Sequence, residues 1–326
     1  MRKSLAANAL TLIIFGMIAL AVVVSWGRSQ FYVAGPLVEP LLITVDSGDN
    51  LSDITPRLVA GGAIENEQIF RLGARYSGLA SQLKFGEYEI PAGASMEGIL
   101  LLISSGRSIQ YKVTIPEGLS SFEVVQVLLE DPILTGEIAD IPPEGSLAPD
   151  TYLFGRGASR DSIIETMTEA QLDILTAAWI GRMPNLPVNT AEELLILASI
   201  IEKETGLAEE RRQVASVFIN RLERGMRLQT DPSVVYGITL GREKLGRGLR
   251  RSELDRETPY NTYLISGLPP TPIANPGRAA IAAAANPDNT PYLFFVADGT
   301  GGHAFATTNA DHNANVARWR AIENSN

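Results

Sequence analysis

Two glutamates end a strongly apolar segment that has the length of a helix. Residues 191–206 read AEELLILASIIEKETG, and the apolar residues from Leu194 to Ile201 cover nearly the whole circumference of a helix. A helix that is apolar all round is buried, so Glu202 and Glu204 emerge in apolar surroundings at its end. Burial disfavours the ionised form of a carboxyl group and raises its pKa. A carboxylic acid that keeps its proton near neutral pH can serve as the general acid of glycosidic cleavage.

The helix geometry does not choose between these two glutamates. Either one can instead pair with Lys203 or with an arginine and simply close the helix. The start and end of the helix are marked, because Thr190 and Glu193 form a capping-box pattern and Gly206 follows as a stop signal.

Three other polar segments are weaker candidates. Residues 229–232, Gln-Thr-Asp-Pro, form either an Asx-type turn or a polar wall of a cleft. Residues 260–263, Tyr-Asn-Thr-Tyr, are either an ordinary strand or turn, or a pair of aromatic faces with polar groups that suit a sugar ring. The basic stretch 242–256 is either a solvated loop or a contact for anionic groups.

Several kinds of chemistry lack the residues that they need. The 326 residues include no cysteine, which excludes a thiol nucleophile and a cysteine-ligated metal site. His303 and His312 do not have metal-ligand spacing, and the motifs of nucleotide hydrolysis and serine acylation are missing. We therefore expect neither a metal nor a cofactor. A net charge of −10 also argues against binding to nucleic acid.

The N-terminus predicts a membrane anchor. From Ser4 to Gly27 the chain carries no charge, which exceeds the roughly 20 residues that span a bilayer core as a helix. Arg2 and Lys3 precede this segment and Arg28 follows it, so the charge bias places the N-terminus in the cytoplasm. The alternative is a cleaved signal peptide, but no small-x-small cleavage site follows the apolar run.

A weak internal repeat follows a linker at residues 29–40. Residues 43–59 and 113–129 both read as a short strand, a glycine-bearing turn and an amphipathic helix, and 88–106 is a fainter third copy. The helices are expected to begin at Asn50, Ser95 and Ser120, the last with a capping box. Such units are either a packing repeat without a ligand or a glycan-binding module.

The rest of the chain is mostly helical, which makes the expected fold class α+β. A loop-rich boundary at 139–160 precedes the remaining elements. The expected helices cover 161–181, 190–205, 209–224 and 311–323, and one strand covers 292–297. Between 226 and 302 the pattern otherwise predicts loops.

Seven ordered motifs closely resemble the YceG-like family, the endolytic murein transglycosylases. They are PEGSLAPDTYLF (143–154), LASIIEKETG (197–206), VASVFINRL (214–222), MRLQTDPSVVYG (226–237), PYNTY (259–263), GLPPTPIANPG (267–277) and YLFFVADGTGGHAF (292–305). The resemblance extends upstream to the repeat, which is similar to the family's LysM-like module, and to the membrane span.

The resemblance implies a division of the chain and a location. Residues 1–28 would be the short cytoplasmic N-terminus and membrane anchor, 29–40 the linker and 41–110 the LysM-like module. Residues 111–326 would be the α+β transglycosylase domain, with a catalytic core at about 143–326. The protein would cross the inner membrane once and hold its catalytic domain in the periplasm.

The resemblance also implies an activity and its residues. The family cleaves the MurNAc–GlcNAc bond inside nascent glycan strands and leaves 1,6-anhydro-MurNAc ends. Its catalytic glutamate, the first of the EKET motif, corresponds to Glu202, which would act first as acid and then as base. The residues expected around the scissile bond are Asn220, Gln229, Thr230, Asp231, Tyr260, Asn261, Thr262 and Tyr263.

Two other functions remain open at this point. One is a non-catalytic peptidoglycan-binding scaffold of the cell-wall synthesis machinery. The other is a hydrolytic muramidase that uses Glu202 with Asp231 or Glu204 as base. The implied partners are peptidoglycan strands and, from the family alone, peptidoglycan synthases (penicillin-binding proteins) and the elongation machinery.

Overall fold

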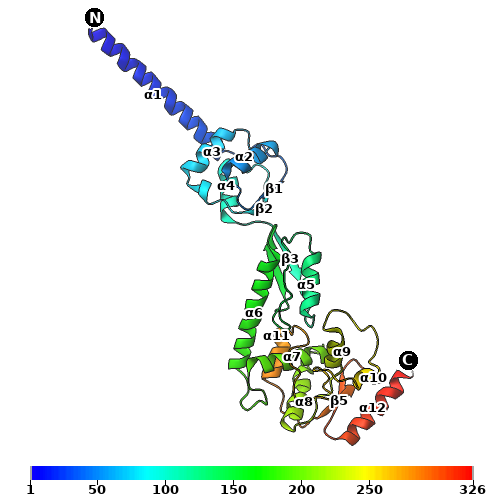
Figure 1. The fold of residues 1–326 in the computed structure, drawn as a ribbon. Helices are drawn as coiled ribbons and strands as arrows, with labels where there is room; N and C mark the ends of the chain where they lie inside the picture. The colour runs from blue at the N-terminus through cyan, green and yellow to red at the C-terminus, as the bar shows by residue number, and fades with distance from the viewer. Residues whose placement is uncertain (1, 325–326) are drawn as a thin grey trace. The chain divides into compact units, whose positions relative to one another are not determined.

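The structure is a computed structural model that describes residues 2–324, with side chains from residue 8 onward. Helices predominate, and the strands within this range form two-stranded sheets, so the fold mixes helix and sheet as expected (Figure 1). The chain divides into two compact units. The N-terminal unit comprises Met1–Tyr111 and Leu153–Ala158, and the C-terminal unit comprises Lys112–Tyr152 and Ser159–Asn326.

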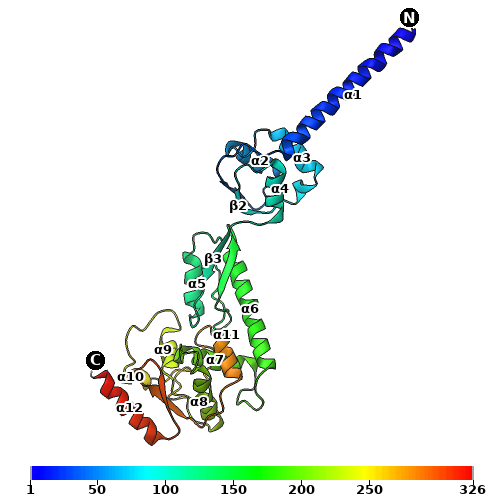
Figure 2. The same ribbon diagram turned by 180° about the vertical axis from the view of Figure 1, so that it is seen from behind.

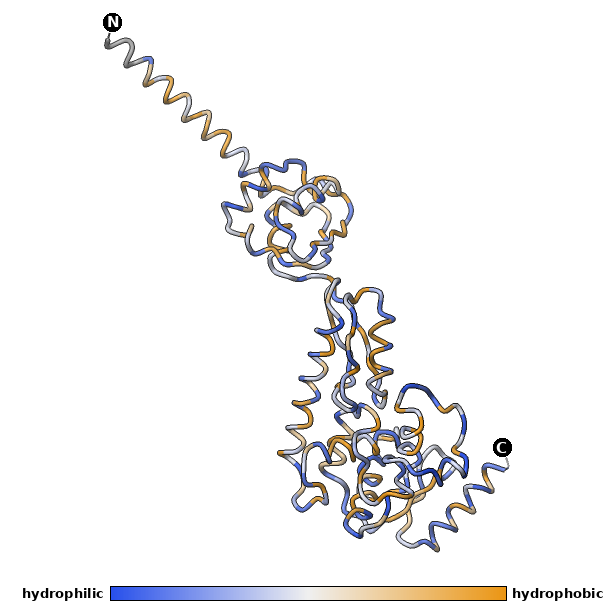
Figure 3. Tube along the Cα trace, viewed as in Figure 1, coloured by the Kyte–Doolittle hydropathy of each residue, from blue (hydrophilic) through white to orange (hydrophobic). Residues whose placement is uncertain are grey.

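Helix α1 (Arg2–Tyr32) contains a segment, Asn8–Tyr32, that is long and apolar enough to cross a membrane. Residues 8–26 of this segment are exposed, and the apolar stretch stands out in the hydropathy colouring of Figure 3. The side chains of Arg2 and Lys3, on which the predicted orientation depends, lie outside the described residues.

The helix continues past the predicted boundary at residue 28. Phe31 is buried, and its ring lies so close to Gly73 of α3 (Glu67–Tyr76) that a β-carbon there would meet it at 2.2 Å. The first four residues of the predicted linker 29–40 are therefore helical, because Phe31 is part of the core of the N-terminal unit.

The N-terminal unit follows the order strand, helix, helix, strand, helix. The elements are β1 (Leu41–Val45), α2 (Leu51–Ala60), α3, the short 3₁₀ helix η1 (Leu79–Ser81), β2 (Gly86–Ile90) and α4 (Met96–Ser105). Strands β1 and β2 are antiparallel, with Leu41 opposite Ile90 and Val45 opposite Gly86. Helices α2 and α4 begin at the predicted caps, Asn50 and Ser95.

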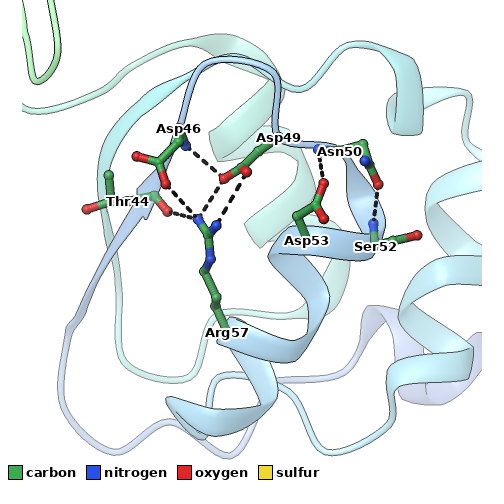
Figure 4. Close-up of polar contacts among 7 residues, drawn as sticks. All are labelled: Thr44, Asp46, Asp49, Asn50, Ser52, Asp53 and Arg57. Carbon is green, nitrogen blue, oxygen red and sulfur yellow. Dashed lines mark hydrogen bonds and ion pairs between the residues drawn. The ribbon is translucent and has the colours of Figure 1, made fainter.

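An ion-paired arginine braces the turn between β1 and α2 (Figure 4). Arg57 Nη1 donates to the Thr44 carbonyl at 2.9 Å and to Asp49 Oδ2 at 2.6 Å. The same Asp49 oxygen accepts from the Asp46 amide at 2.8 Å, which closes the turn. The turn in the first repeat copy is thus held by Asp49 within the turn and by Arg57 of the helix that follows.

The C-terminal unit is built largely from helices. They are α5 (Ser121–Glu130), α6 (Arg160–Ile180), α7 (Ala191–Glu204), α8 (Arg211–Glu223), α9 (Asp231–Thr239), α10 (Arg251–Leu254), α11 (Arg278–Ala285) and α12 (Asn309–Glu323). Strands β5 (Phe294–Ala297) and β6 (His303–Ala306) form an antiparallel pair. Strands β3 (Gln110–Thr114) and β4 (Thr151–Gly155) also pair, and each is divided between the two units.

Helix α7 lies at the centre of the C-terminal unit. It packs against α6, α8, α9 and α11, and Figures 1 and 2 show α7 and α11 side by side. Leu194, Leu197, Ile200 and Ile201 are fully buried, which confirms the prediction of a buried helix. Hence the residues at the end of α7 are positioned by the core itself.

Local capping follows the sequence with one exception. Ser120 caps α5 with the predicted capping box. Thr190 caps α7 by accepting from the Glu193 amide, but the Glu193 carboxylate bonds to the Asn189 amide instead of completing the box.

Helices α9, α10 and α11 lie between residues 226 and 302, where the sequence pattern predicts loops. The alanine-rich sequence of α11, RAAIAAAA, carried the helix signal among its Pro- and Gly-rich neighbours.

The packing of Phe31 predicts a measurable loss of stability. Phe31→Ala should lower the stability of the N-terminal unit by about 3 kcal/mol, because it empties a buried aromatic site. Hydrogen exchange of the β1 and β2 amides, in the detergent-solubilised full chain, reports this loss. The exposed Val33→Ala is the matched control, and equal protection in both variants would contradict the assignment of Phe31 to the core.

Candidate active site

Glu202 lies in the last turn of α7, with its carboxylate beside the start of α11. It is half-buried, and its Oε2 accepts a hydrogen bond from the Gly277 amide at 3.0 Å. Gly277 is the N-cap residue of α11, so the carboxylate meets the positive end of that helix dipole.

The pKa of Glu202 is raised above its ordinary value. Burial is the largest cause, and the nearby Glu117 carboxylate acts in the same direction. The Gly277 amide, Arg211 and Lys203 act in the opposite direction because they favour the anion. The net result is a carboxyl group that holds its proton at higher pH than a solvated glutamate and still has a donor ready for the ionised form.

Buried polar side chains fix the segment that carries Gly277. Asn275 Nδ2 donates to the Leu119 carbonyl at 3.1 Å, and Asn275 Oδ1 accepts from the Leu147 amide at 2.9 Å. Gln171 Nε2 donates to the carbonyls of Gly145 and Pro276. The donor that faces Glu202 is therefore held from several directions.

Glu204 lies in a different environment from Glu202. The Thr230 hydroxyl, at the start of α9, donates to Glu204 Oε1. Burial is the main cause that raises the pKa of Glu204, and the Asp231 carboxylate adds to it. Glu204 thus connects the end of α7 to the start of α9.

Five of the eight predicted substrate contacts come together near Glu204. The Gln229 amide donates to the Thr262 carbonyl and the Thr230 amide to Thr262 Oγ1. The Tyr263 hydroxyl donates to Asp231 Oδ1 at 2.6 Å. Gln229 is exposed and has a φ of 52°, a strained conformation for a residue other than glycine.

The other three predicted contacts are engaged with the protein itself. Asn220 Nδ2 donates to the carbonyls of Thr290 and Tyr292, and Asn261 Nδ2 to those of Leu254 and Arg256. The Tyr260 hydroxyl bonds to Thr271 Oγ1, and its ring meets Tyr236 edge to face. Within residues 2–324, none of the eight hydrogen-bonds to Glu202; its hydrogen bond comes from Gly277.

The structure also reveals polar residues that sequence reasoning missed. Glu144 accepts from the Ser121 amide at 2.8 Å and from the Tyr236 hydroxyl at 3.1 Å, and burial raises its pKa. It lies in the PEGSLAPDTYLF motif, which was the available signal. The charges of Glu117 and Arg211 act on Glu202: the first raises its pKa and the second lowers it. Glu117 lies in the glycine-bearing turn of the repeat copy at 113–129, where the pattern predicts only a turn.

Two arginines of the basic stretch and one of the two histidines have ordinary partners. Arg247 forms a two-pronged ion pair with Glu253, and Arg251 pairs with Asp255. His303 Nδ1 lies 2.7 Å from Glu210 Oε2. Across the described part of the chain, no group of three or more His, Asp or Glu side chains could hold a metal ion.

Replacing Glu204 should change how stability depends on pH. Because the folded chain holds the Glu204 proton above its ordinary pKa of 4.5, the unfolded chain releases that proton first as the pH rises, and the wild type loses stability through this window. Glu204→Gln removes the titration and keeps an oxygen for Thr230. Its stability relative to wild type should therefore increase from about pH 4.5 up to the raised pKa and then level off.

Urea unfolding at a series of pH values measures this difference. The exposed Glu209→Gln is the matched control, and it should follow the wild type throughout. A Glu204→Gln curve parallel to that of the wild type would show that Glu204 ionises freely in the folded chain.

Comparisons with known proteins identify the family to which the chain is similar. The model of the YceG-like family matches residues 43–318. The chain is 29% identical over 314 residues to an endolytic murein transglycosylase of Bacillus subtilis (strain 168), covering 86% of this chain and 85% of that protein. It is 28% identical over 324 residues to a protein of the same name from Streptococcus pneumoniae serotype 2, covering 84% of this chain and 57% of the longer relative.

A solved structure agrees with these matches. The 2.6 Å crystal structure of a putative yceG-like protein from Listeria monocytogenes is 31% identical to the chain, with a TM-score of 0.50. The match covers 85% of this chain and 99% of that one. The chain belongs to the YceG-like family.

Proposed function

We propose that the chain is an endolytic murein transglycosylase, a lyase that cleaves the MurNAc–GlcNAc bond within peptidoglycan strands and leaves 1,6-anhydro-MurNAc ends. The observation that carries the proposal is the half-buried Glu202, with a raised pKa and a hydrogen bond from Gly277, in a chain of the YceG-like family. Curated relatives from two genera carry the name of this activity.

The environment of Glu202 suits a residue that acts twice. As an acid, it gives its proton to the bridging oxygen while the bond from that oxygen to C1 of MurNAc breaks. As a carboxylate, it takes the proton of the C6 hydroxyl while O6 bonds to C1, which closes the anhydro ring and restores the acid. Burial favours the first state, and the Gly277 amide stabilises the second.

The predicted substrate residues divide into two proposed roles. We propose that Gln229, Asp231 and Tyr263, which are exposed or half-buried, contact the glycan. Thr230 and Thr262 are buried and support that surface through their mutual hydrogen bond. Asn220, Tyr260 and Asn261 would act by holding neighbouring segments in place, since their polar groups already bond to the protein.

The same proposal covers the remainder of the chain. Helix α1 would anchor the protein in the inner membrane. Residues 1–28 would comprise the short cytoplasmic N-terminus and the membrane anchor, and residues 111–326 the periplasmic transglycosylase domain. Residues 41–110 would be the LysM-like module, supported by the order β1, α2, α3, β2 and the antiparallel pairing of its strands. Peptidoglycan synthases and the elongation machinery are the proposed partners.

Glu202→Gln should separate the enzyme from a binding scaffold. Loss of the acid should lower the rate of strand cleavage by roughly 10²–10⁴-fold, while binding to strands persists. The assay uses the detergent-solubilised full chain on purified glycan strands, with products read by mass spectrometry. Glu192→Gln, at the exposed start of the same helix, is the control.

The mass of the new ends decides the reaction type. A transglycosylase yields ends lighter by one water than those of a hydrolase. Ends that carry this water would identify a muramidase, and wild-type protein that binds strands without cutting them would identify a scaffold.

The pH dependence of cleavage should have a defined sign. Because Glu202 must begin as the acid, kcat/KM should fall as the pH rises through its raised pKa, above the ordinary value of 4.5. Initial rates across a pH series test this. A rate that increases with pH over the same range would mean that the carboxylate, and not the acid, is the starting form.

A further inference from the structure

The glycine turn that precedes a helix occurs three times in the chain. Gly48, Gly93 and Gly118 occupy matching positions and have φ values of 91°, 69° and 77°, which glycine adopts without strain. The residue before each glycine is exposed and is Ser47, Ala92 or Glu117 in turn. The turn itself therefore does not require a carboxylate at this position.

The third turn is fixed beside Glu202. Lys203 Nζ donates to the Gly118 carbonyl at 3.0 Å, and the Gly118 amide donates to the Asn275 carbonyl at 3.0 Å. A β-carbon on Gly118 would lie 3.6 Å from Glu202 Cγ. The backbone of the turn is thus in contact distance of the proposed acid.

Gly277 brings the two carboxylates to the same place. Its amide donates to Glu202, and a β-carbon on it would lie 1.8 Å from Glu117 Oε1. Its φ of −74° is one that any residue adopts, so the backbone conformation does not demand glycine. The missing side chain leaves the space that the Glu117 carboxylate occupies.

Glu117 is available to a ligand. Its side chain is exposed, and among residues 2–324 it forms neither a hydrogen bond nor an ion pair. Cleavage of a glycosidic bond passes through an oxocarbenium-like state with positive charge on the sugar ring. A carboxylate carried on an ordered turn beside the acid is suited to stabilise that charge.

We propose that Glu117 is the second carboxylate of the active site, which faces the sugar ring next to Glu202 and stabilises the positive charge that develops on it. This inference rests on the proposed function. The same negative charge favours the protonated form of Glu202 and offsets the two cations that face it, Arg211 and Lys203. Glu117 therefore assists before the bond breaks as well as during its cleavage.

Glu117→Gln tests both effects. In the full chain, it should lower kcat by roughly 10-fold or more and shift the high-pH limb of the rate profile to lower pH, because the loss of a negative charge makes Glu202 more acidic. Arg211→Gln should shift the same limb to higher pH. A purely structural role for Glu117 would not produce limb shifts of opposite sign in the two variants.

Gly277→Ala is a second variant that leaves the charge in place. Its β-carbon must displace the Glu117 carboxylate, the far end of a flexible side chain, so the fold should persist while kcat falls. Glu130→Gln, at the exposed end of α5, is the control, and thermal melts establish that each variant is folded.

The result that would overturn the inference is a folded Glu117→Gln with the kcat and pH profile of the wild type. Failure of the proposed function gives a different result, since the wild type itself would then leave hydrated ends or no new ends. The two failures are therefore distinguishable in one set of assays.

Discussion

The protonation state of Glu202 depends on opposing influences, of which burial and one backbone hydrogen bond are the two largest. Burial at the end of α7 favours the neutral acid, and the Gly277 amide at the start of α11 favours the anion. A group that first gives and then accepts a proton requires that neither form be strongly preferred. The depth at which the end of α7 is buried and the position at which α11 begins must therefore be matched, because the first raises the pKa of Glu202 and the second lowers it.

The core of the C-terminal unit meets both constraints through buried polar groups. The Ser199 hydroxyl, on α7 itself, accepts from the Ile273 amide at 3.0 Å, and Gln171 on α6 holds the Pro276 carbonyl. Asn275 bonds on one side to residue 119 and on the other to residue 147. A buried polar group that loses its partner costs about 1–3 kcal/mol, so the 273–277 segment cannot shift without a penalty at each of these bonds.

The elements that the sequence predicted well are those whose signals are local. Helix α7 has continuous apolar residues and a threonine cap, and α5 has a complete capping box, so each could be located from neighbouring residues alone. The contact between Glu202 and Gly277 joins residues 75 positions apart. No local pattern encodes it. Likewise, the predicted substrate contacts Asn220 and Asn261 donate their side-chain amides to backbone carbonyls. The residue type alone does not determine whether an asparagine amide bonds to the protein or to a ligand.

Glu117 illustrates how a packing motif can acquire a functional group without altering its fold. In the N-terminal unit the glycine turns carry Ser47 and Ala92, and there the turn simply joins a strand to a helix. Around Glu117, the hydrogen bonds that fix the turn all belong to the backbone of residues 118 and 119. The side chain at 117 contributes to none of them. The backbone at this position is therefore held in place whichever residue type occupies it. The backbone of the turn is already ordered, so a ligand that meets this side chain adds only the cost of ordering the side chain itself. This makes the position better suited to carry a charge than a mobile loop would be.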